Sequence, residues 1–247
     1  MSTGVLIYNF DTPTINYSRI TRHCVSYIKK YLDLPITIVS DKKFENLNTV
    51  IVDPQKNNQR RYNRETHPWY NQERTGAFDH SPYDTTILMD CDYFVMSDYL
   101  LRLANTVNDV LLHTKINDIT KRNNIVHSRE ALIPLVWATV VVFKKNNFTK
   151  KLFDLIKNIQ KNYYYYRMLY RIKPTSYRND YAFAIALHQL YGNCKENYSI
   201  PTAMNMIGTD SKILDMTDNS LTFSWKNQYS ILCDQDVHVF NKEIFDV

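Results

Sequence analysis

Short apolar runs alternate with segments of helical periodicity along this chain, and this alternation is the strongest constraint on its fold. Residues 5–10 and 36–39 are short apolar runs, typical of buried strands. Between them, residues 15–32 carry apolar side chains at three- and four-residue steps, which predicts an amphipathic helix. Strands alternating with helices indicate an α/β domain with a mainly parallel, twisted sheet flanked by helices.

The rest of the chain extends this pattern. Further strands are expected over residues 50–52, 86–90, 107–112, 134–143 and 237–240. Helical segments are expected over residues 100–103, 148–159 and 180–190. Asn147 is predicted to cap the second of these helices, and Gly192 to end the third. The segment 53–71 is polar, basic and without period, which predicts a long functional loop.

Composition narrows the class of protein. The chain has 247 residues and no internal repeat, which favours a single domain. Only four residues are Gly and no G-x-G-x-x-G or Walker pattern occurs, which argues against a glycine-rich phosphate loop. No apolar run approaches the roughly 18 residues of a membrane span, and no signal peptide is recognisable, so a soluble, cytoplasmic protein is expected. The cysteines are scattered without a C-x-x-C pair: Cys24, Cys91, Cys194 and Cys233.

Two segments combine basic and aromatic side chains. The formal net charge is +5, and segments 56–74 and 157–178 concentrate Lys and Arg among Tyr and Trp. Cations spaced among flat rings suit a polyanion whose bases or sugars can stack on them. A solvated helix face and a tyrosine-rich loop would give the same pattern, and both interpretations stay open at this point.

The strongest local signal is a pair of carboxylates directly after an apolar strand, in the run Ile87-Leu-Met-Asp90-Cys91-Asp92. Residues i and i+2 of an extended chain point to the same side, so the two carboxylates are expected to converge. They lie at the carboxyl end of a strand, where open α/β sheets bind ligands. Oxygen ligands of this kind suit Mg²⁺ or Mn²⁺ together with phosphate oxygens. The alternative is a pair of polar residues that cap a turn.

Three chemistries use such a pair of carboxylates. A phosphatase with an aspartate nucleophile has the pair on its first strand, with Thr or Val two residues after the second Asp, where this chain has Phe94. A calcium loop needs Gly at its sixth position, where this chain has Val95. A sugar-nucleotide transferase fits both the position near residue 90 and the apolar surroundings.

The run from Tyr83-Asp84 to Asp90-Cys91-Asp92 resembles the central signature of GT-A-fold glycosyltransferases of the glycogenin and lipopolysaccharide-galactosyltransferase type, Y-D-x-x-L-x-L-D-A-D. These enzymes also carry a late H-x-x-G-x-x-K motif whose His binds the metal. His238 is in a similar setting, although Asn241 replaces the Gly and Lys242 comes early. The resemblance implies one GT-A-like domain over residues 1–247, with a nucleotide-binding half (1–112) and an acceptor-side half (113–247).

Two further similarities are looser. The strand from Trp137 to Phe143 is similar to the donor-sugar strand N-x-G-V-x-x-F, but it lacks the Asn and the Gly. The run Arg178-Asn-Asp180 resembles the start of the following helix, whose acidic residue contacts the donor sugar. Asp180 is therefore expected at the reactive face of the sugar; as the alternative, it caps its own helix.

The resemblance also implies the residue roles of a metal-dependent sugar transfer. Asp90, Asp92 and His238 hold Mn²⁺ or Mg²⁺ against the two phosphates of a nucleoside-diphosphate sugar, UDP-sugar being the expected donor. Asp92 and Asp180 are the expected catalytic residues, and Arg74 and Lys242 share the charge of the diphosphate. The residues expected near the nucleoside are Tyr8, Asn9, Phe10, Thr12 and Asp41.

The acceptor is suggested only by charge and general character. A positive balance, the basic-aromatic segments and a likeness to bacteriophage-encoded transferases favour a hydroxylated base of phage DNA, modified in the host cytoplasm. Glycans, lipids and proteins stay open as acceptors. Two other functions also remain: a catalytically silent nucleic-acid-binding module on a nucleotide-sugar fold, and a nucleotidyltransferase.

Overall fold

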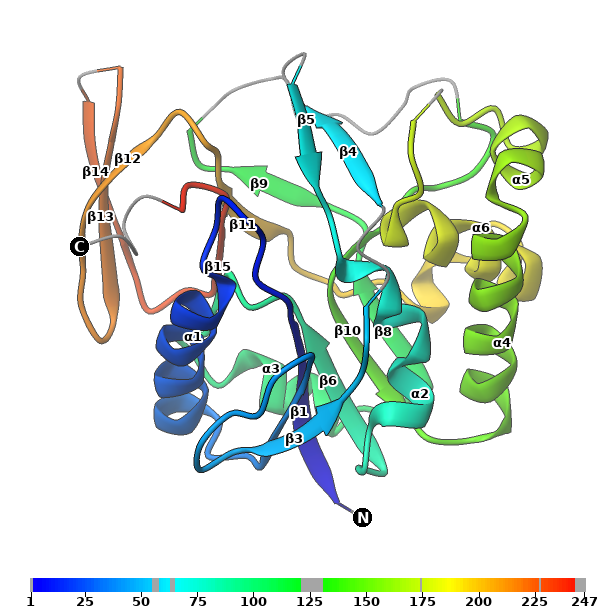
Figure 1. The fold of residues 1–247 in the computed structure, drawn as a ribbon, viewed down its shortest axis with the longest axis horizontal. Coiled ribbons are helices and arrows are strands. Elements are labelled where there is room, and N and C mark those ends of the chain that lie inside the picture. Colours follow the sequence, from blue (N-terminus) through cyan, green and yellow to red (C-terminus); the bar gives the residue numbers. More distant parts are fainter. Residues whose placement is uncertain are drawn as a thin grey trace.

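The structure is a computed structural model, and it describes residues 2–54, 58–62, 65–120, 131–173, 175–226 and 228–242. Its centre is a six-stranded sheet in the order β3-β2-β1-β6-β10-β8 (Figure 1). The strands are β1 (Thr3–Asn9), β2 (Ile36–Ser40), β3 (Asn48–Ile51), β6 (Thr85–Met89), β8 (Val110–His113) and β10 (Trp137–Lys144). The pairs among β3, β2, β1 and β6 are parallel, whereas β10 runs antiparallel to both of its neighbours. The expected α/β fold with a mainly parallel sheet is confirmed.

Helices cover both faces of this sheet, because its strands are apolar on both sides. On one face, α1 (Tyr17–Tyr31) and α3 (Tyr99–Ala104) share a hydrophobic core with β1, β2 and β6. On the other face lie α2 (Ala77–His80), α4 (Asn147–Lys161) and α6 (Asn179–Tyr191) (Figure 1). Within the described residues, no helix is both long and apolar enough to cross a membrane.

The helix ends follow local chemistry. The side chain of Asn16 accepts the backbone N–H of Arg19 at the start of α1. Asn146, one residue before the predicted Asn147, caps α4 and forms a capping box with Thr149. Gly192 ends α6 at a φ of 64°, a backbone conformation that is strained for other residues, so this prediction is confirmed.

A second sheet brings the C-terminal part of the chain to the end of β6. It has the order β7-β15-β11-β9, with β7 (Tyr93–Phe94), β9 (Ile116–Asp118), β11 (Met204–Ile207) and β15 (Val237–Val239). The strands β12 (Lys212–Met216), β13 (Ser220–Trp225) and β14 (Gln228–Cys233) form a separate antiparallel sheet at the side of the molecule (Figure 1). A short 3₁₀ helix, η2, covers Lys195–Asn197.

The structure corrects several expected elements. The segment 53–71 is not simply a loop, since β4 (Gln59–Tyr62) and β5 (Glu65–Pro68) form a hairpin in it, followed by the 3₁₀ helix η1 (Asn71–Gly76). Cross-strand backbone bonding forms this hairpin without the apolar alternation that would have revealed it. The strand expected from 107 begins only at Val110, and Val107 is exposed. The tyrosine run forms the helix α5 (Tyr163–Leu169). Lys56 and Arg64 of the first basic-aromatic segment lie outside the described residues.

Candidate metal and donor site

The carboxylate pair lies where β6 ends and the chain turns toward the second sheet. The backbone N–H of Asp90 donates to the carbonyl of Thr139 on β10, 2.9 Å away, which keeps Asp90 at the edge of the sheet. Tyr93 N–H then donates to the carbonyl of Asp90 at 3.1 Å, so residues 90–93 form a turn. The expected extended backbone at Asp90 and Asp92 is therefore wrong. The turn, and not strand alternation, sets the directions of the two side chains.

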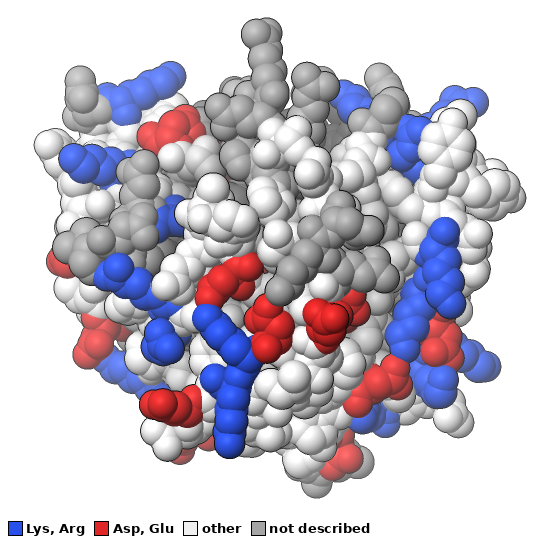
Figure 2. Space-filling view, viewed as in Figure 1, with Lys and Arg blue, Asp and Glu red and all other residues white. Residues whose placement is uncertain are grey.

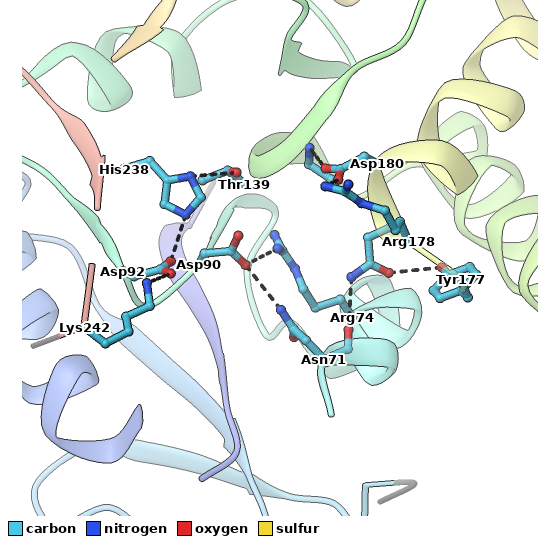
Figure 3. Close-up of polar contacts among 12 residues, drawn as sticks. Asn71, Arg74, Asp90, Asp92, Thr139, Tyr177, Arg178, Asp180, His238 and Lys242 are labelled. Atoms are coloured by element: carbon cyan, nitrogen blue, oxygen red, sulfur yellow. Dashed lines mark hydrogen bonds and ion pairs between the residues drawn. The ribbon is translucent and has the colours of Figure 1, made fainter. Parts of the chain in front are cut away.

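Pairing of β7 with β15 brings His238 to these carboxylates. Tyr93 lies opposite His238 in the register, and Val239 N–H donates to the carbonyl of Asp92 at 2.9 Å. One ligand atom each from Asp90, Asp92 and His238 lies within 4.8 Å of the other two (Figure 3). The three residues predicted as metal ligands from distant parts of the sequence are thus brought together.

Three cationic or basic side chains surround the two carboxylates. His238 Nε2 lies 3.1 Å from Asp92 Oδ1, and Lys242 Nζ binds Asp92 Oδ2 (Figure 3). Arg74, from η1, forms an ion pair with Asp90 Oδ1, and its side chain is only 2% exposed. Both predicted diphosphate contacts, Arg74 and Lys242, are therefore at the carboxylates.

The two carboxylates differ in their electrostatics. Burial raises the pKa of Asp90 above its ordinary value, because the Arg74 guanidinium offsets only part of the lost hydration. Burial also favours the neutral form of Asp92, but Lys242 and His238 outweigh it and hold the pKa of Asp92 below its usual range. Asp92 is thus a fixed anion, whereas the charge of Asp90 is under-compensated by its neighbours. An additional cation between them would stabilise the ionised form of Asp90.

The residues present fit a divalent metal with a phosphate-bearing ligand. Two carboxylates and an imidazole form a donor set that suits Mn²⁺ or Mg²⁺ completed by further oxygens. Arg74 is buried, and its Nε and Nη2 have no hydrogen-bond partner within the described part of the chain. Buried guanidinium N–H groups are normally paired, so these two indicate an anionic ligand beside Asp90.

Asp180 is oriented toward β10 by its own bonds. Its Oδ1 accepts the backbone N–H of Ala138 at 2.9 Å, and its Oδ2 accepts Arg178 Nη2 at 2.8 Å (Figure 3). Arg178, and not Asp180, is the N-cap residue of α6. The alternative interpretation of Asp180 as the cap of its own helix is therefore wrong. Its carboxylate bonds instead to the backbone of Ala138 on β10.

A chain of hydrogen bonds links this part of the site to Asp90 through residues that were not predicted from the sequence. Tyr177 donates its hydroxyl proton to Asn179 Oδ1 at 3.0 Å, and Asn179 Nδ2 donates to the carbonyl of Asn71 at 3.0 Å. Asn71 Nδ2 donates to Asp90 Oδ1 at 3.3 Å (Figure 3). On the other side of the site, the hydroxyl oxygen of Thr139 lies 3.4 Å from His238 Nδ1. Isolated Asn and Tyr residues carry no sequence signal for such a network.

Most of the residues expected near the nucleoside lie at the end of β1 or just after it, beside Asp90, since Ile7 pairs with Met89. Asp41 follows the neighbouring strand β2. Tyr8 is buried, and its hydroxyl lies 2.8 Å from His80 Nδ1. Phe10 is also buried, Thr12 bonds to Ile15 and is partly exposed, and Asp41 is exposed.

Asn9 is not available to a ligand through its side chain. It is fully buried, and its amide binds Ser18 and Thr21. The side chain joins β1 to α1, so the expected contact with the nucleoside stays a prediction for the backbone of Asn9. Cys91 is also buried, and burial raises the pKa of its thiol.

Comparison with solved structures places this geometry on a known fold. A crystal structure of an active-site mutant of LgtC aligns with a TM-score of 0.52 and 12% identity, over 76% of this chain and 70% of that chain. The chain has the GT-A fold. The galactosyltransferase LgtC in complex with donor and acceptor sugar analogs aligns with a TM-score of 0.49 and 10% identity, over the same shares of the two chains.

The apo-form glycosyltransferase GlyE of Streptococcus pneumoniae TIGR4 aligns with a TM-score of 0.48 and 10% identity, over 81% of this chain. The chain spans about 45% of the length of GlyE. No protein-family model matches the sequence, and no curated protein matches it.

Proposed function

We propose that this protein is a metal-dependent glycosyltransferase that moves a sugar from a nucleoside-diphosphate sugar to an acceptor. The observation that carries the proposal is the convergence of Asp90, Asp92 and His238 at the carboxyl edge of the sheet of a GT-A fold. Ligands bind at this edge in open α/β sheets. The nearby Arg74 adds unpaired N–H groups suited to an anion.

Each side chain of the site has a part in this proposal. Asp90, Asp92 and His238 hold Mn²⁺ or Mg²⁺, which when bound neutralises the charge that develops on the leaving diphosphate. Arg74 keeps the N–H groups of Nε and Nη2 free to donate to phosphate oxygens. Lys242 uses two of its three protons, on Asp92 and on the carbonyl of Val239, so one remains for the same purpose.

Asp180 is proposed to bind the donor sugar. The backbone of Ala138 and the guanidinium of Arg178 fix its carboxylate, which is 14% exposed. A fixed, ionised carboxylate can accept sugar hydroxyls and stabilise positive charge on the anomeric carbon. The division into a nucleotide-binding half (1–112) and an acceptor-side half (113–247) stays a prediction.

The nucleoside is proposed to lie over the end of β1, near Tyr8, Phe10, Thr12 and Asp41. UDP is the expected nucleotide, from the resemblance alone. A hydroxylated base of phage DNA in the host cytoplasm stays a prediction for the acceptor, carried by the basic-aromatic segments of the sequence.

A donor screen tests the proposal. The melting temperature of the purified chain is measured with UDP-, GDP- and ADP-sugars, each with and without Mn²⁺. In parallel incubations, the phosphate species released from each donor are identified. We expect one donor class to raise the melting temperature only with the cation, and to release a nucleoside diphosphate. Asp92→Asn should abolish both effects. Asp84→Asn, at the opposite end of β6, is the matched control and should abolish neither, since among the described residues the hydrogen bonds of the Asp84 carboxylate go to Ser2.

Other outcomes separate the alternatives. Release of pyrophosphate would identify a nucleotidyltransferase. Salt-sensitive binding to DNA that survives Asp92→Asn, without any product, would identify a catalytically silent nucleic-acid-binding module. Absence of stabilisation by every donor would contradict the proposed function.

A further inference from the structure

The short helix α5 exposes apolar and aromatic side chains to solvent. Tyr164, Tyr165, Met168 and Leu169 are 72%, 63%, 58% and 52% exposed, and Leu132, whose backbone bonds to the end of this helix, is 58% exposed. Scattered surface hydrophobics are ordinary, but several on one helix indicate an interaction surface. We call these five residues the α5 surface.

The opposite side of α5 packs against described residues of the fold. Tyr166 accepts a hydrogen bond from Asn158 on α4 at 3.1 Å, and Tyr170 accepts one from Gln189 on α6 at 3.3 Å. Tyr163 packs edge-on against Tyr177 with ring centroids 5.4 Å apart. The outer side of α5 is exposed and makes none of these contacts, and polar residues would be expected there.

One buried cation orients this outer side. Arg167 is 9% exposed, and its guanidinium lies 5.2 Å from the ring centre of Tyr164 and 3.7 Å from the sulfur of Met168. It also donates to the carbonyl of Ile172 at 3.4 Å. These contacts hold Tyr164 and Met168 outward instead of letting them fold back on the helix.

The charged side chains of the segment that contains α5 have one sign. Residues 155–179 contain no Asp or Glu and carry Lys157, Lys161, Arg167, Arg171, Lys173 and Arg178. Lys161, Arg171 and Lys173 are exposed, and no acidic side chain that the structure describes forms an ion pair with them. The upper right of Figure 2, over α5, accordingly shows Lys and Arg beside uncharged side chains. An anionic partner complements this charge.

The aliphatic side chains distinguish between anionic partners. Nucleic acids contact Lys and Arg through phosphates and aromatic rings through base stacking, and neither contact uses Met168, Leu169 or Leu132. Transfer of Leu and Met side chains from water into the acyl layer of a membrane is favourable. Tyr rings and the charged ends of Lys and Arg are stable among the lipid headgroups above that layer. We propose that the α5 surface binds the surface of an anionic lipid bilayer.

This binding is independent of the proposed sugar transfer, but it would bring the membrane close to the site. Tyr163 of α5 contacts Tyr177, whose hydroxyl begins the amide chain through Asn179 and Asn71 to Asp90. A bilayer bound at α5 would therefore be joined to the carboxylates by this short series of contacts.

Co-sedimentation of the full chain with lipid vesicles tests the proposal. We expect binding to phosphatidylcholine vesicles that contain phosphatidylglycerol, little binding to pure phosphatidylcholine, and a marked decrease at high salt. The double variant Met168→Ser/Leu169→Ser should lower the partition coefficient about tenfold or more. Lys173→Gln should lower it about fivefold.

Matched variants keep the test independent of folding. Tyr229→Ser/Ile231→Ser removes two side chains on β14 that are 76% and 66% exposed, and it should leave vesicle binding unchanged. Circular dichroism verifies that each variant is folded; should the Met168/Leu169 pair fail this check, Lys161→Gln/Lys173→Gln provides the same comparison. Equal binding to neutral and anionic vesicles, an equal loss in the β14 control, or no sedimentation would overturn the proposal. Binding to double-stranded DNA without binding to vesicles would assign the surface to nucleic acid instead.

Discussion

Two neighbouring parallel strands, β1 and β6, both lead into carboxylates at the same edge of the sheet, but the carboxylates are used differently. After β1, Asp11 is satisfied by its own surroundings. Its Oδ1 accepts the backbone N–H of Ser18 at 2.8 Å, and its Oδ2 accepts the hydroxyl of Ser18 at 3.0 Å and the ammonium of Lys42. Asp11 therefore stabilises the start of α1.

After β6, the two carboxylates lie among more charged groups than are needed to pair them. Asp90 and Asp92 are surrounded by Arg74, Lys242 and His238, and Arg74 still has two nitrogens, Nε and Nη2, without a partner among the described residues. A structural carboxylate is complete when its acceptors are filled, as Asp11 shows. Surplus charge of both signs in a partly buried cluster indicates a place for a further ligand.

The largest expected difference between the carboxylates after β1 and those after β6 is in enzymatic activity. Asp92→Asn removes one metal ligand and leaves Lys242 and His238 without their anion, so donor turnover with Mn²⁺ should fall about a thousandfold, or about 4 kcal/mol. Asp11→Asn should retain turnover within about threefold, because Asp11 bonds inside the fold. Steady-state release of nucleoside diphosphate measures both. Equal losses in the two variants would remove the distinction between the strand ends.

The next effect concerns the stability of the carboxylate cluster. Arg74→Met leaves the carboxylate of Asp90 without its buried partner, and the free energy of unfolding should fall by about 3 kcal/mol. Urea unfolding at neutral pH measures it. The double variant Arg74→Met/Asp90→Asn should recover part of the loss, since no unpaired charge then remains. A double variant no more stable than Arg74→Met would show that packing of the long Arg side chain, and not charge, is responsible.

The amide chain beside Asp90 should have a smaller effect, on rate more than on donor binding. Asn179→Ala removes the bond to the carbonyl of Asn71 and loosens Asn71 against Asp90. We expect kcat to fall about tenfold, which corresponds to about 1.4 kcal/mol, with little change in the KM for the donor. Asn158→Ala, which removes an exposed bond to Tyr166, is the matched control. A raised KM with unchanged kcat would instead place Asn179 in donor binding.

The smallest effect belongs to Asp11 and depends on pH. Partial burial raises the pKa of Asp11, but Lys42 and Ser18 outweigh it, so the pKa lies below the ordinary value of 3.8. The carboxylate therefore stabilises the fold above about pH 3.8, and this contribution is lost as the pH falls through the lower value of the folded state. Because Asp11 is partly exposed, less than about 1 kcal/mol is expected.

Urea unfolding of the wild type and Asp11→Asn at pH 7, 4 and 3 checks this prediction. The difference in unfolding free energy between the two proteins should shrink toward pH 3. A difference that stays constant over this range would mean that shape complementarity, and not charge, makes Asp11 stabilising.

The pattern of apolar residues in the sequence predicted the strands and helices whose formation depends on neighbouring residues in the chain. The apolar runs became β1, β2, β6 and β10, and the periodic segments became α1, α4 and α6, because burial and side-chain period act within a few residues. Of the second sheet, only β15 was predicted, as the strand over residues 237–240. The β4–β5 hairpin and the strands β7, β9 and β11 escaped prediction, since backbone pairing with a partner holds them, and apolar alternation does not mark them.

For the candidate site, sequence alone identified Asp90 and Asp92 as a carboxylate pair at the end of a strand, because adjacency and strand context are written in one dimension. Only the tertiary structure decided that a turn directs them, that Asn9 faces inward, and that Asn71 and Asn179 support Asp90. His238 shows the physical reason. It lies 146 residues from Asp92 along the chain, and only the pairing of β7 with β15 brings the two side chains to 3.1 Å.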